Sequence, residues 1–166
     1  IDKFENNEKV TLLMKACSNK NESKSFFQII ADNIGDEGLS SLNYRNVFKN
    51  YNCQKISVDC IVLNDFLQID SEKDMFVKID VEGHELEVLE GMSMFFKSGQ
   101  VKYLQFEYGN CMLEQGKNLN DIIEWLSKFK EYKICDFTTL NFIEIDNNNI
   151  NNYINSAWCN LYIIKK

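Results

Sequence analysis

The pattern of apolar and polar positions is clearest over residues 75–91, which read MFVKIDVEGHELEVLEG. Phe76, Val77 and Ile79 form a compact apolar run with polar residues on either side. Such a run is typical of a short strand that is buried on both faces. A carboxylate-rich turn follows the strand, and Gly83 within it permits a tight passage into a helix.

A helix is predicted directly after this turn, because apolar residues recur there at helical spacing. The apolar positions are Leu86, Val88, Leu89, Met92, Phe95 and Phe96. The opposite side carries the charged residues Glu87, Glu90 and Lys97. Glu85 precedes Leu89 by four residues, so its side chain is expected on the buried side of the first turn. Gly99 is a typical residue at which such a helix ends.

Further strands are predicted where short apolar or alternating runs are bounded by turn residues. They cover residues 10–16, 26–30, 56–62, 103–108, 132–137, 142–145 and 158–164. The second of these strands is expected to pair with the first. Residues 119–129 predict an amphipathic helix with an Asn start signal, and residues 64–69 predict a short helical turn. Residues 31–46, 110–117 and 146–155 are predicted loops.

Strands interleaved with helices, with two strands late in the chain, predict an α/β fold. The expected sheet is mostly parallel and is finished by an antiparallel hairpin. The 166 residues contain no internal repeat and no linker-like stretch, so residues 1–166 are expected to form one domain. A hydrophobic content of 45%, with 13% aromatic residues, is enough for a core.

The charge of the chain narrows the range of partners. Its net charge is −7, and the sequence contains no basic patch. Nucleic acid is therefore not expected as the main partner, because its backbone demands clustered lysines and arginines. No apolar run approaches the roughly 18–20 residues that a membrane-spanning helix needs, so no membrane span is expected.

The six cysteines at positions 17, 53, 60, 111, 135 and 159 form no C-x-x-C pair and no zinc-ligand spacing. Most of them lie in apolar stretches, where a free cysteine packs as a small hydrophobic residue. We expect them to be reduced thiols. A cytoplasmic location follows as an expectation.

The candidate chemistry lies after the strand at residues 76–79, where Asp80, Glu82, His84 and Glu85 are crowded together. Ligands of open α/β sheets bind outside the carboxyl ends of the strands. Asp80 directly ends the strand and is the first candidate for a catalytic or cofactor-binding residue. The alternative is that Asp80 caps the following helix.

The other polar residues of this turn also have two interpretations each. Glu82 and Glu85 could orient a substrate, or they could be there for the helix dipole. His84 is the only histidine and could be a base near neutral pH, or it could be an exposed residue at a helix start. A metal cluster of these residues with Asp80 is disfavoured, because the spacing matches no standard site.

The stretch KIDVEGHELEVLEG closely resembles the signature of the FkbM family of methyltransferases, which use S-adenosylmethionine. The resemblance runs from about residue 10 to residue 108. It includes the segments ACSN at 16–19, GLSSL at 38–42, LND at 63–65 and FE at 106–107. The family implies a Rossmann-like sheet and O-methylation of a hydroxyl group on a sugar, polyketide or similar metabolite. The expected partner is thus a small-molecule or glycan acceptor.

The resemblance also implies roles for individual residues. The acidic group Asp80 would lie close to cofactor and acceptor. Cys17 and Ser18 would contact the adenine of the cofactor, although a simple turn is an equal alternative. Ser40 and Ser41 would line the mouth of the pocket or shape the loop. Glu107 would bind the acceptor, the alternative being a buried ion pair.

Methyl transfer to a hydroxyl requires close placement of donor and acceptor, and it is helped by a base that removes the hydroxyl proton. Asp80, Glu82 and His84 are the candidate catalytic residues for that step. The sequence does not select among them.

One part of the family pattern is missing. The D-x-G-A-N-x-G loop that binds the methionine and ribose parts of the cofactor has no counterpart in the sequence. We therefore expect a fragment that lacks the first βαβ unit, in which the strand at 76–79 has an open, apolar edge. The alternative function is a non-catalytic Rossmann-like domain that packs against another chain. A nucleotide-dependent oxidoreductase is disfavoured, because G-x-G-x-x-G is absent.

Overall fold

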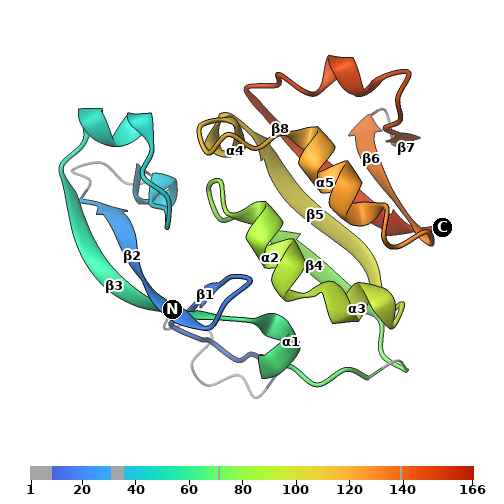
Figure 1. Cartoon of the computed structure of the whole chain (residues 1–166), viewed down its shortest axis with the longest axis horizontal. Coiled ribbons are helices and arrows are strands. Elements are labelled where there is room, and N and C mark those ends of the chain that lie inside the picture. Colours follow the sequence, from blue (N-terminus) through green and yellow to red (C-terminus); the bar gives the residue numbers. More distant parts are fainter. Residues whose placement is uncertain (1–8, 31–35, 71, 139) are drawn as a thin grey trace.

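The computed structural model describes residues 9–30, 36–70, 72–138 and 140–166, which form two sheets and several short helices (Figure 1). The strands are β1 Ala16–Cys17, β2 Glu22–Ile29, β3 Cys53–Ile61, β4 Met75–Ile79, β5 Val101–Gly109, β6 Tyr132–Thr138, β7 Asn141–Glu144 and β8 Trp158–Lys165. The helices are α1 Leu63–Phe66, α2 Glu85–Gly91, α3 Ser93–Lys97, α4 Asn110–Leu113 and α5 Leu119–Leu126. Single 3-10 turns occupy Asp36–Leu39 (η1), Asn46–Asn50 (η2) and Ile150–Asn152 (η3).

The larger sheet has the strand order β4-β5-β8-β6-β7. Among the described neighbouring strand pairs of this sheet, only β4–β5 is parallel, and a crossover through α2 and α3 joins these two strands. The pairs β5–β8, β8–β6 and β6–β7 are antiparallel. The predicted α/β class and the late hairpin β6–β7 are confirmed. The prediction of a mostly parallel sheet is wrong, because three of the four described strand pairs are antiparallel and β8 returns between β5 and β6 antiparallel to both. The Rossmann-like arrangement stays a prediction.

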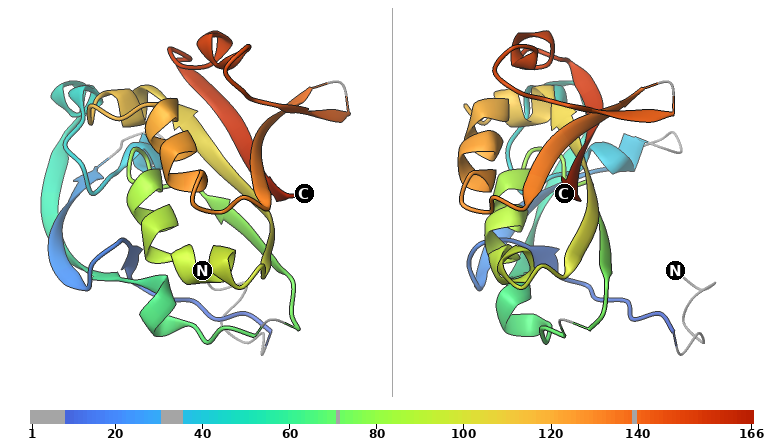
Figure 2. Two further views of the ribbon diagram at one scale, coloured as in Figure 1. Left: turned by 45° about the vertical axis from the view of Figure 1, so that its right-hand side comes forward. Right: turned by 90° about the vertical axis from the view of Figure 1, so that its right-hand side faces the viewer.

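The core lies between this sheet and the helices α2, α3 and α5, which cover one of its faces (Figure 2). Fully buried side chains from both layers include Leu89, Phe95, Leu104, Phe106 and Leu161. Helix α5 starts as predicted, since Asn118 accepts a hydrogen bond from the backbone of Asn120 and forms a capping box with Asp121. The βαβ unit therefore rests on a continuous apolar layer that fixes the end of β4.

Strand β4 lies at the edge of the larger sheet. Its expected open edge is thus present in the structure. The prediction that this strand is buried on both faces is wrong, because Phe76 is 68% exposed and stacks on Tyr103 at a ring distance of 5.6 Å. Alternation along the strand turns Phe76 and Lys78 to the face that the helices leave uncovered, while Ile79 points into the core.

The smaller sheet has the order β1-β3-β2, with β1 parallel and β2 antiparallel to β3. Two predictions fail here. The strand predicted at residues 10–16 is reduced to Ala16–Cys17, and the preceding Leu12, Leu13 and Met14 are exposed. Strand β2 pairs with β3 and not with β1, because the long strand β3 lies between them.

The predicted loops are partly ordered. Of the loop predicted at 31–46, residues 31–35 lie outside the described residues, and η1 and the start of η2 form 3-10 turns. The loop predicted at 110–117 begins with helix α4, which corrects that prediction. All six cysteines are free, as expected.

Candidate functional site

The turn after β4 has an unusual backbone. Glu82 has a φ of 54° and Gly83 a φ of 98°, so two successive residues adopt positive φ before α2 begins at Glu85. A Cβ at position 83 would lie 2.6 Å from the carbonyl oxygen of Cys111, so a larger residue does not fit without a shift of backbone. Positive φ is uncommon for a residue such as glutamate and needs support from its surroundings.

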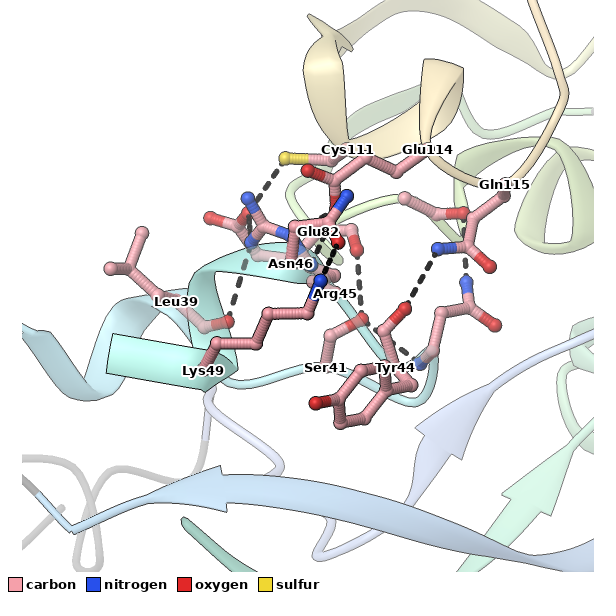
Figure 3. Close-up of polar contacts among 12 residues, drawn as sticks. Leu39, Ser41, Tyr44, Arg45, Asn46, Lys49, Glu82, Cys111, Glu114 and Gln115 are labelled. Atoms are coloured by element: carbon pink, nitrogen blue, oxygen red, sulfur yellow. Dashed lines mark hydrogen bonds and ion pairs between the residues drawn. The ribbon is translucent and has the colours of Figure 1, made fainter. Parts of the chain in front are cut away.

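Both the backbone and the side chain of Glu82 receive that support (Figure 3). The hydroxyl of Ser41 donates to the backbone oxygen of Glu82 at 2.8 Å. The guanidinium of Arg45 forms an ion pair with the Glu82 carboxylate. The thiol of Cys111 donates to the same carboxylate at 3.0 Å. Glu82 is therefore held by two segments that are distant in the sequence.

Arg45 comes from the segment 41–46, which lies against the turn and helix α4 (Figure 3). Asn43 donates to the backbone oxygen of Gly83 at 2.9 Å, and the backbone of Asn46 donates to Glu114 at 3.1 Å. Arg45 is only 8% exposed and is the only arginine in the sequence. The sequence analysis missed it, although a single arginine just after the Ser40-Ser41 pair was a usable signal.

Glu107, at the carboxyl end of β5, joins this group. One oxygen of Glu107, one of Glu82 and the sulfur of Cys111 all lie within 4.8 Å of one another. Burial raises the pKa of Glu107 above its ordinary value, and the negative charges of Glu82 and Asp80 raise it further. A hydrogen bond from Trp158 lowers this pKa and so opposes the shift. Glu82 and Glu107 therefore lie together at one end of the sheet.

Asp80 lies at the rim of the same end. Its side chain is 44% exposed, and Lys78 donates to it at 2.7 Å. Asp80 makes no cap for helix α2, whose N-cap residue is His84. An exposed carboxylate at the carboxyl end of a parallel strand is placed where a ligand can reach it.

His84 lies inside the protein, so the expectation of an exposed histidine is wrong. It is fully buried, and its Nε2 is hydrogen-bonded to the hydroxyl of Ser18 at 3.0 Å. Its Nδ1 lies 3.7 Å from Glu87, which also pairs with Lys117. Burial lowers the pKa of His84 to about 4 against the opposing charge of Glu87, so the ring is neutral at pH 7.

Ser18, like His84, is fully buried, and Cys17 packs against the core. Their contacts attach strand β1 to helix α2. The hydroxyl of Ser18 has no exposed surface for a ligand. These contacts favour the turn over the adenine-binding role that the resemblance implies.

Glu85 is buried, as predicted, with 2% of its surface exposed. One of its oxygens accepts from the backbone of Gly83 at 3.1 Å, and the other has no hydrogen-bond partner among the described residues. Burial raises the pKa of Glu85 to about 7, although backbone hydrogen bonds oppose the shift. Glu85 thus supports the turn from inside and does not reach the surface.

Ser40 and Ser41 both hydrogen-bond to the backbone. Ser40 accepts from the backbone of Ile29 at 3.0 Å, and Ser41 contacts Asn43 as well as Glu82. These contacts favour the loop-shaping alternative for both serines. Through Ser41 the loop acts directly on the turn at Glu82.

The structure does not bring Asp80, Glu82, His84 and Glu85 together as a metal cluster; among the described residues the convergent set is Glu82, Glu107 and Cys111. Arg45 already neutralises Glu82 in that set. Burial also raises the pKa of the Cys111 thiol, which keeps it protonated and a poor metal ligand.

A βαβ unit with acidic residues at the carboxyl ends of both parallel strands is typical of ligand-binding α/β proteins. The sequence model of the methyltransferase FkbM domain matches residues 5–137. The chain therefore belongs to the FkbM methyltransferase family, and this membership implies an S-adenosylmethionine-dependent methyltransferase. No curated protein and no solved structure matches the chain significantly. Within the described ranges, every helix is too short or too polar to traverse a membrane.

Carboxylates suit the positive sulfonium and ammonium groups of S-adenosylmethionine. Asp80, Glu82 and Glu107 lie at one end of the sheet, but Asp80 is paired with Lys78 and Glu82 with Arg45, so among the described residues Glu107 alone of the three has no ion pair. Asp80 is the exposed member of this set. Ser18 does not fit, because it is enclosed with His84.

Proposed function

We propose that this chain transfers a methyl group from S-adenosylmethionine to a hydroxyl group of a small-molecule or glycan acceptor, with a sugar, polyketide or similar metabolite as the substrate class. The observation that carries the proposal is the group of carboxylates at the ends of β4 and β5. Family membership supplies the methyl donor, and the resemblance supplies the acceptor class. The free cysteines favour a reducing compartment such as the cytoplasm.

Glu107 is the best-placed base in this group. Asp80 is paired with Lys78, and Glu82 is paired with Arg45, whereas no ion pair within the described residues involves Glu107. Its raised pKa makes it a stronger base than an ordinary carboxylate. His84 is a weaker candidate, because it is buried and bonded to Ser18.

The bound cofactor supplies an electrophilic methyl group. Asp80 would hold the cofactor by accepting hydrogen bonds from the hydroxyl or ammonium groups of S-adenosylmethionine. Glu107 would accept a hydrogen bond from the acceptor hydroxyl and would then take its proton as that oxygen becomes methylated. Placement of the two reactants supplies the rest of the rate enhancement.

The first test is calorimetric titration of S-adenosylmethionine and S-adenosylhomocysteine into the protein, repeated with Asp80→Ala. We expect binding that Asp80→Ala weakens about tenfold or more, as is typical when a charged contact is lost. Asn120→Ala is a matched control, because Asn120 is exposed and lies on α5. Absence of binding by well-folded protein would refute the proposal for this chain.

The second test is the pH dependence of methyl transfer, measured with a panel of hydroxylated acceptors. The rate is expected to fall as the pH drops through the raised pKa of Glu107, because the protonated carboxyl group cannot accept the proton. Glu107→Gln should lower kcat by about 10²-fold or more and leave cofactor binding unchanged. An active Glu107→Gln enzyme with the same pH profile would exclude Glu107 as the base.

A second candidate function, a domain that packs against another polypeptide, is favoured by the uncovered face of the larger sheet. Phe76, Tyr103 and Phe142 are exposed there. An open hollow of about 370 Å³ lies between them and Tyr162. Apolar surface of this kind is typical of an interface. A monodisperse monomer by light scattering that binds cofactor would argue against this candidate.

A further inference from the structure

Three carboxylates lie at the carboxyl ends of β4 and β5, and their charges are balanced differently. Lys78 neutralises Asp80, and Arg45 neutralises Glu82. Glu107 has no cationic partner within ion-pair distance among the described residues. The charge that the site presents to an acceptor is therefore set by which carboxylates are already paired.

We propose that Arg45 is a positioning residue: its ion pair holds Glu82 in the left-handed turn and cancels its charge, so that Glu107 alone offers a free carboxylate to the acceptor. The inference rests on the proposed function for its chemical meaning. The placement of Glu82 and the effect on Glu107 are measurable without cofactor or acceptor.

The geometry of Arg45 explains why this role needs an arginine. Its guanidinium contacts the Glu82 carboxylate, donates to the backbone oxygen of Leu39 at 3.3 Å and lies 4.0 Å from Glu114. A planar guanidinium offers several donors in fixed directions, whereas a lysine ammonium acts as a point charge. One side chain thus joins the turn, the η1 segment and helix α4.

Burial makes the ion pair with Glu82 necessary. The side chains of Arg45 and Glu82 are 9% and 12% exposed. Removing one partner of so enclosed a pair leaves the other charge uncompensated. The uncompensated charge would then act on the neighbouring carboxylate of Glu107, which lies within 4.8 Å.

Attachment of the loop 41–46 is a separate role that does not need the charge of Arg45. Ser41 and Asn43 donate to backbone oxygens of the turn, and Gln115 donates to the backbone oxygen of Tyr44. These neutral contacts would persist in a variant without the guanidinium. A purely structural role of Arg45 therefore predicts that Arg45→Lys and Arg45→Gln change the titration of Glu107 alike, although only Arg45→Gln removes the charge.

The charged and titratable groups around Glu107 come from each neighbouring element. They are Lys78, Asp80, Glu82 and Glu85 from β4, the turn and α2, Arg45 from the segment before η2, Cys111 from α4 and Cys159 from β8. Of these, Arg45 lowers the pKa of Glu107, and Glu82 raises it. Changes at these two positions are thus expected to act in opposite directions.

The experiment is an NMR titration of the Glu107 side-chain carboxyl carbon in the full chain and its variants. Arg45→Gln should raise the pKa of Glu107 by about 1 pH unit, because the uncompensated Glu82 then repels a second negative charge. Glu82→Gln should lower it. The double variant should lie above the Glu82→Gln value, because it also loses the direct attraction between Arg45 and Glu107.

Two further variants separate charge from geometry. Arg45→Lys keeps the positive charge but loses the planar guanidinium with its several donors. The pKa of Glu107 should therefore stay within about 0.3 pH unit of its original value, while KM for the acceptor rises more than kcat falls. It also serves if Arg45→Gln does not fold. Lys49→Gln is the matched control, because Lys49 is exposed in the same segment and bonds only to Asn46 among the described residues.

An unchanged Glu107 titration in folded Arg45→Gln would overturn the inference and leave Arg45 a structural residue. Equal shifts in Lys49→Gln and Arg45→Gln would overturn it as well, since the effect would then be general. Absent cofactor binding with the expected titration shifts would refute the proposed function alone. The two failures are therefore distinguishable.

Discussion

Glu82 and His84 lie two residues apart in one turn, yet they belong to different environments. Glu82 is in a charged cluster with Arg45 and Cys111 that borders solvent. His84 is fully buried with Ser18 and is neutral at pH 7. The two positive φ angles between β4 and α2 divide the chain at Gly83. The turn thus separates residues that are available for chemistry from residues that hold the fold.

The variant with the largest expected effect on this turn is Gly83→Ala. The new Cβ would require a positive φ and would lie 2.6 Å from the Cys111 carbonyl oxygen, so the free energy of unfolding should fall by about 3 kcal/mol or more. Urea denaturation measures it. Gly116→Ala is the control, because its φ is also positive but no atom lies within 4 Å of the Cβ; it should cost roughly 1–2 kcal/mol. Equal losses of unfolding free energy in the two variants would show that the backbone around Cys111 can move to accommodate the new Cβ.

The next test uses pH, because the two buried neighbours His84 and Glu85 titrate in opposite senses. Burial lowers the pKa of His84 from 6.5 to about 4, so the unfolded chain binds the proton first and stability is lost as the pH falls from 6.5 to 4. Burial raises the pKa of Glu85 from 4.5 to about 7, so stability is lost as the pH rises from 4.5 to 7. Between pH 4.5 and 6.5 the two contributions oppose each other in the native protein.

Single variants should expose each contribution. In His84→Gln the free energy of unfolding should fall with rising pH between 4.5 and 7, by on the order of 3 kcal/mol. In Glu85→Gln it should fall with dropping pH between 6.5 and 4, by a similar amount. Urea denaturation across this pH range gives both slopes. Parallel pH curves for the two variants would contradict the buried environment of both residues.

Local patterns of apolar and turn residues were enough to predict several helices and strands. The helix at α5 was predictable because Asn118 provides a capping signal and the apolar spacing follows it. Strands β5 and β8 were predictable because their residues are apolar and bounded by turns. The direction of β8 was not predictable. Its place between β5 and β6 depends on contacts between residues distant in the sequence, and such contacts leave no local sequence pattern.

The site was partly predictable for a related reason. Asp80, Glu82 and Glu107 follow two adjacent strands, and the ends of parallel strands meet at one edge of a sheet. The burial of His84 depends on the positive φ of Glu82, which a glutamate in a sequence does not indicate. The role of Arg45 depends on a loop folding back onto the turn, and this too is a long-range contact.

The smallest expected effects come from two variants. One should weaken cofactor binding with little change in stability, and the other should lower stability with no change in binding. Asp80→Asn removes an exposed ion pair, which is worth about 0–1 kcal/mol, so the melting temperature should change by roughly 4 °C or less while affinity for the cofactor falls. Ser18→Ala leaves His84 without its partner, which costs about 1–3 kcal/mol, while the affinity stays unchanged. Differential scanning calorimetry and cofactor titration on both variants measure the two effects. If folded Ser18→Ala loses affinity instead, Ser18 contacts the cofactor as the family resemblance implies, and the division of the turn at Gly83 does not separate function from fold.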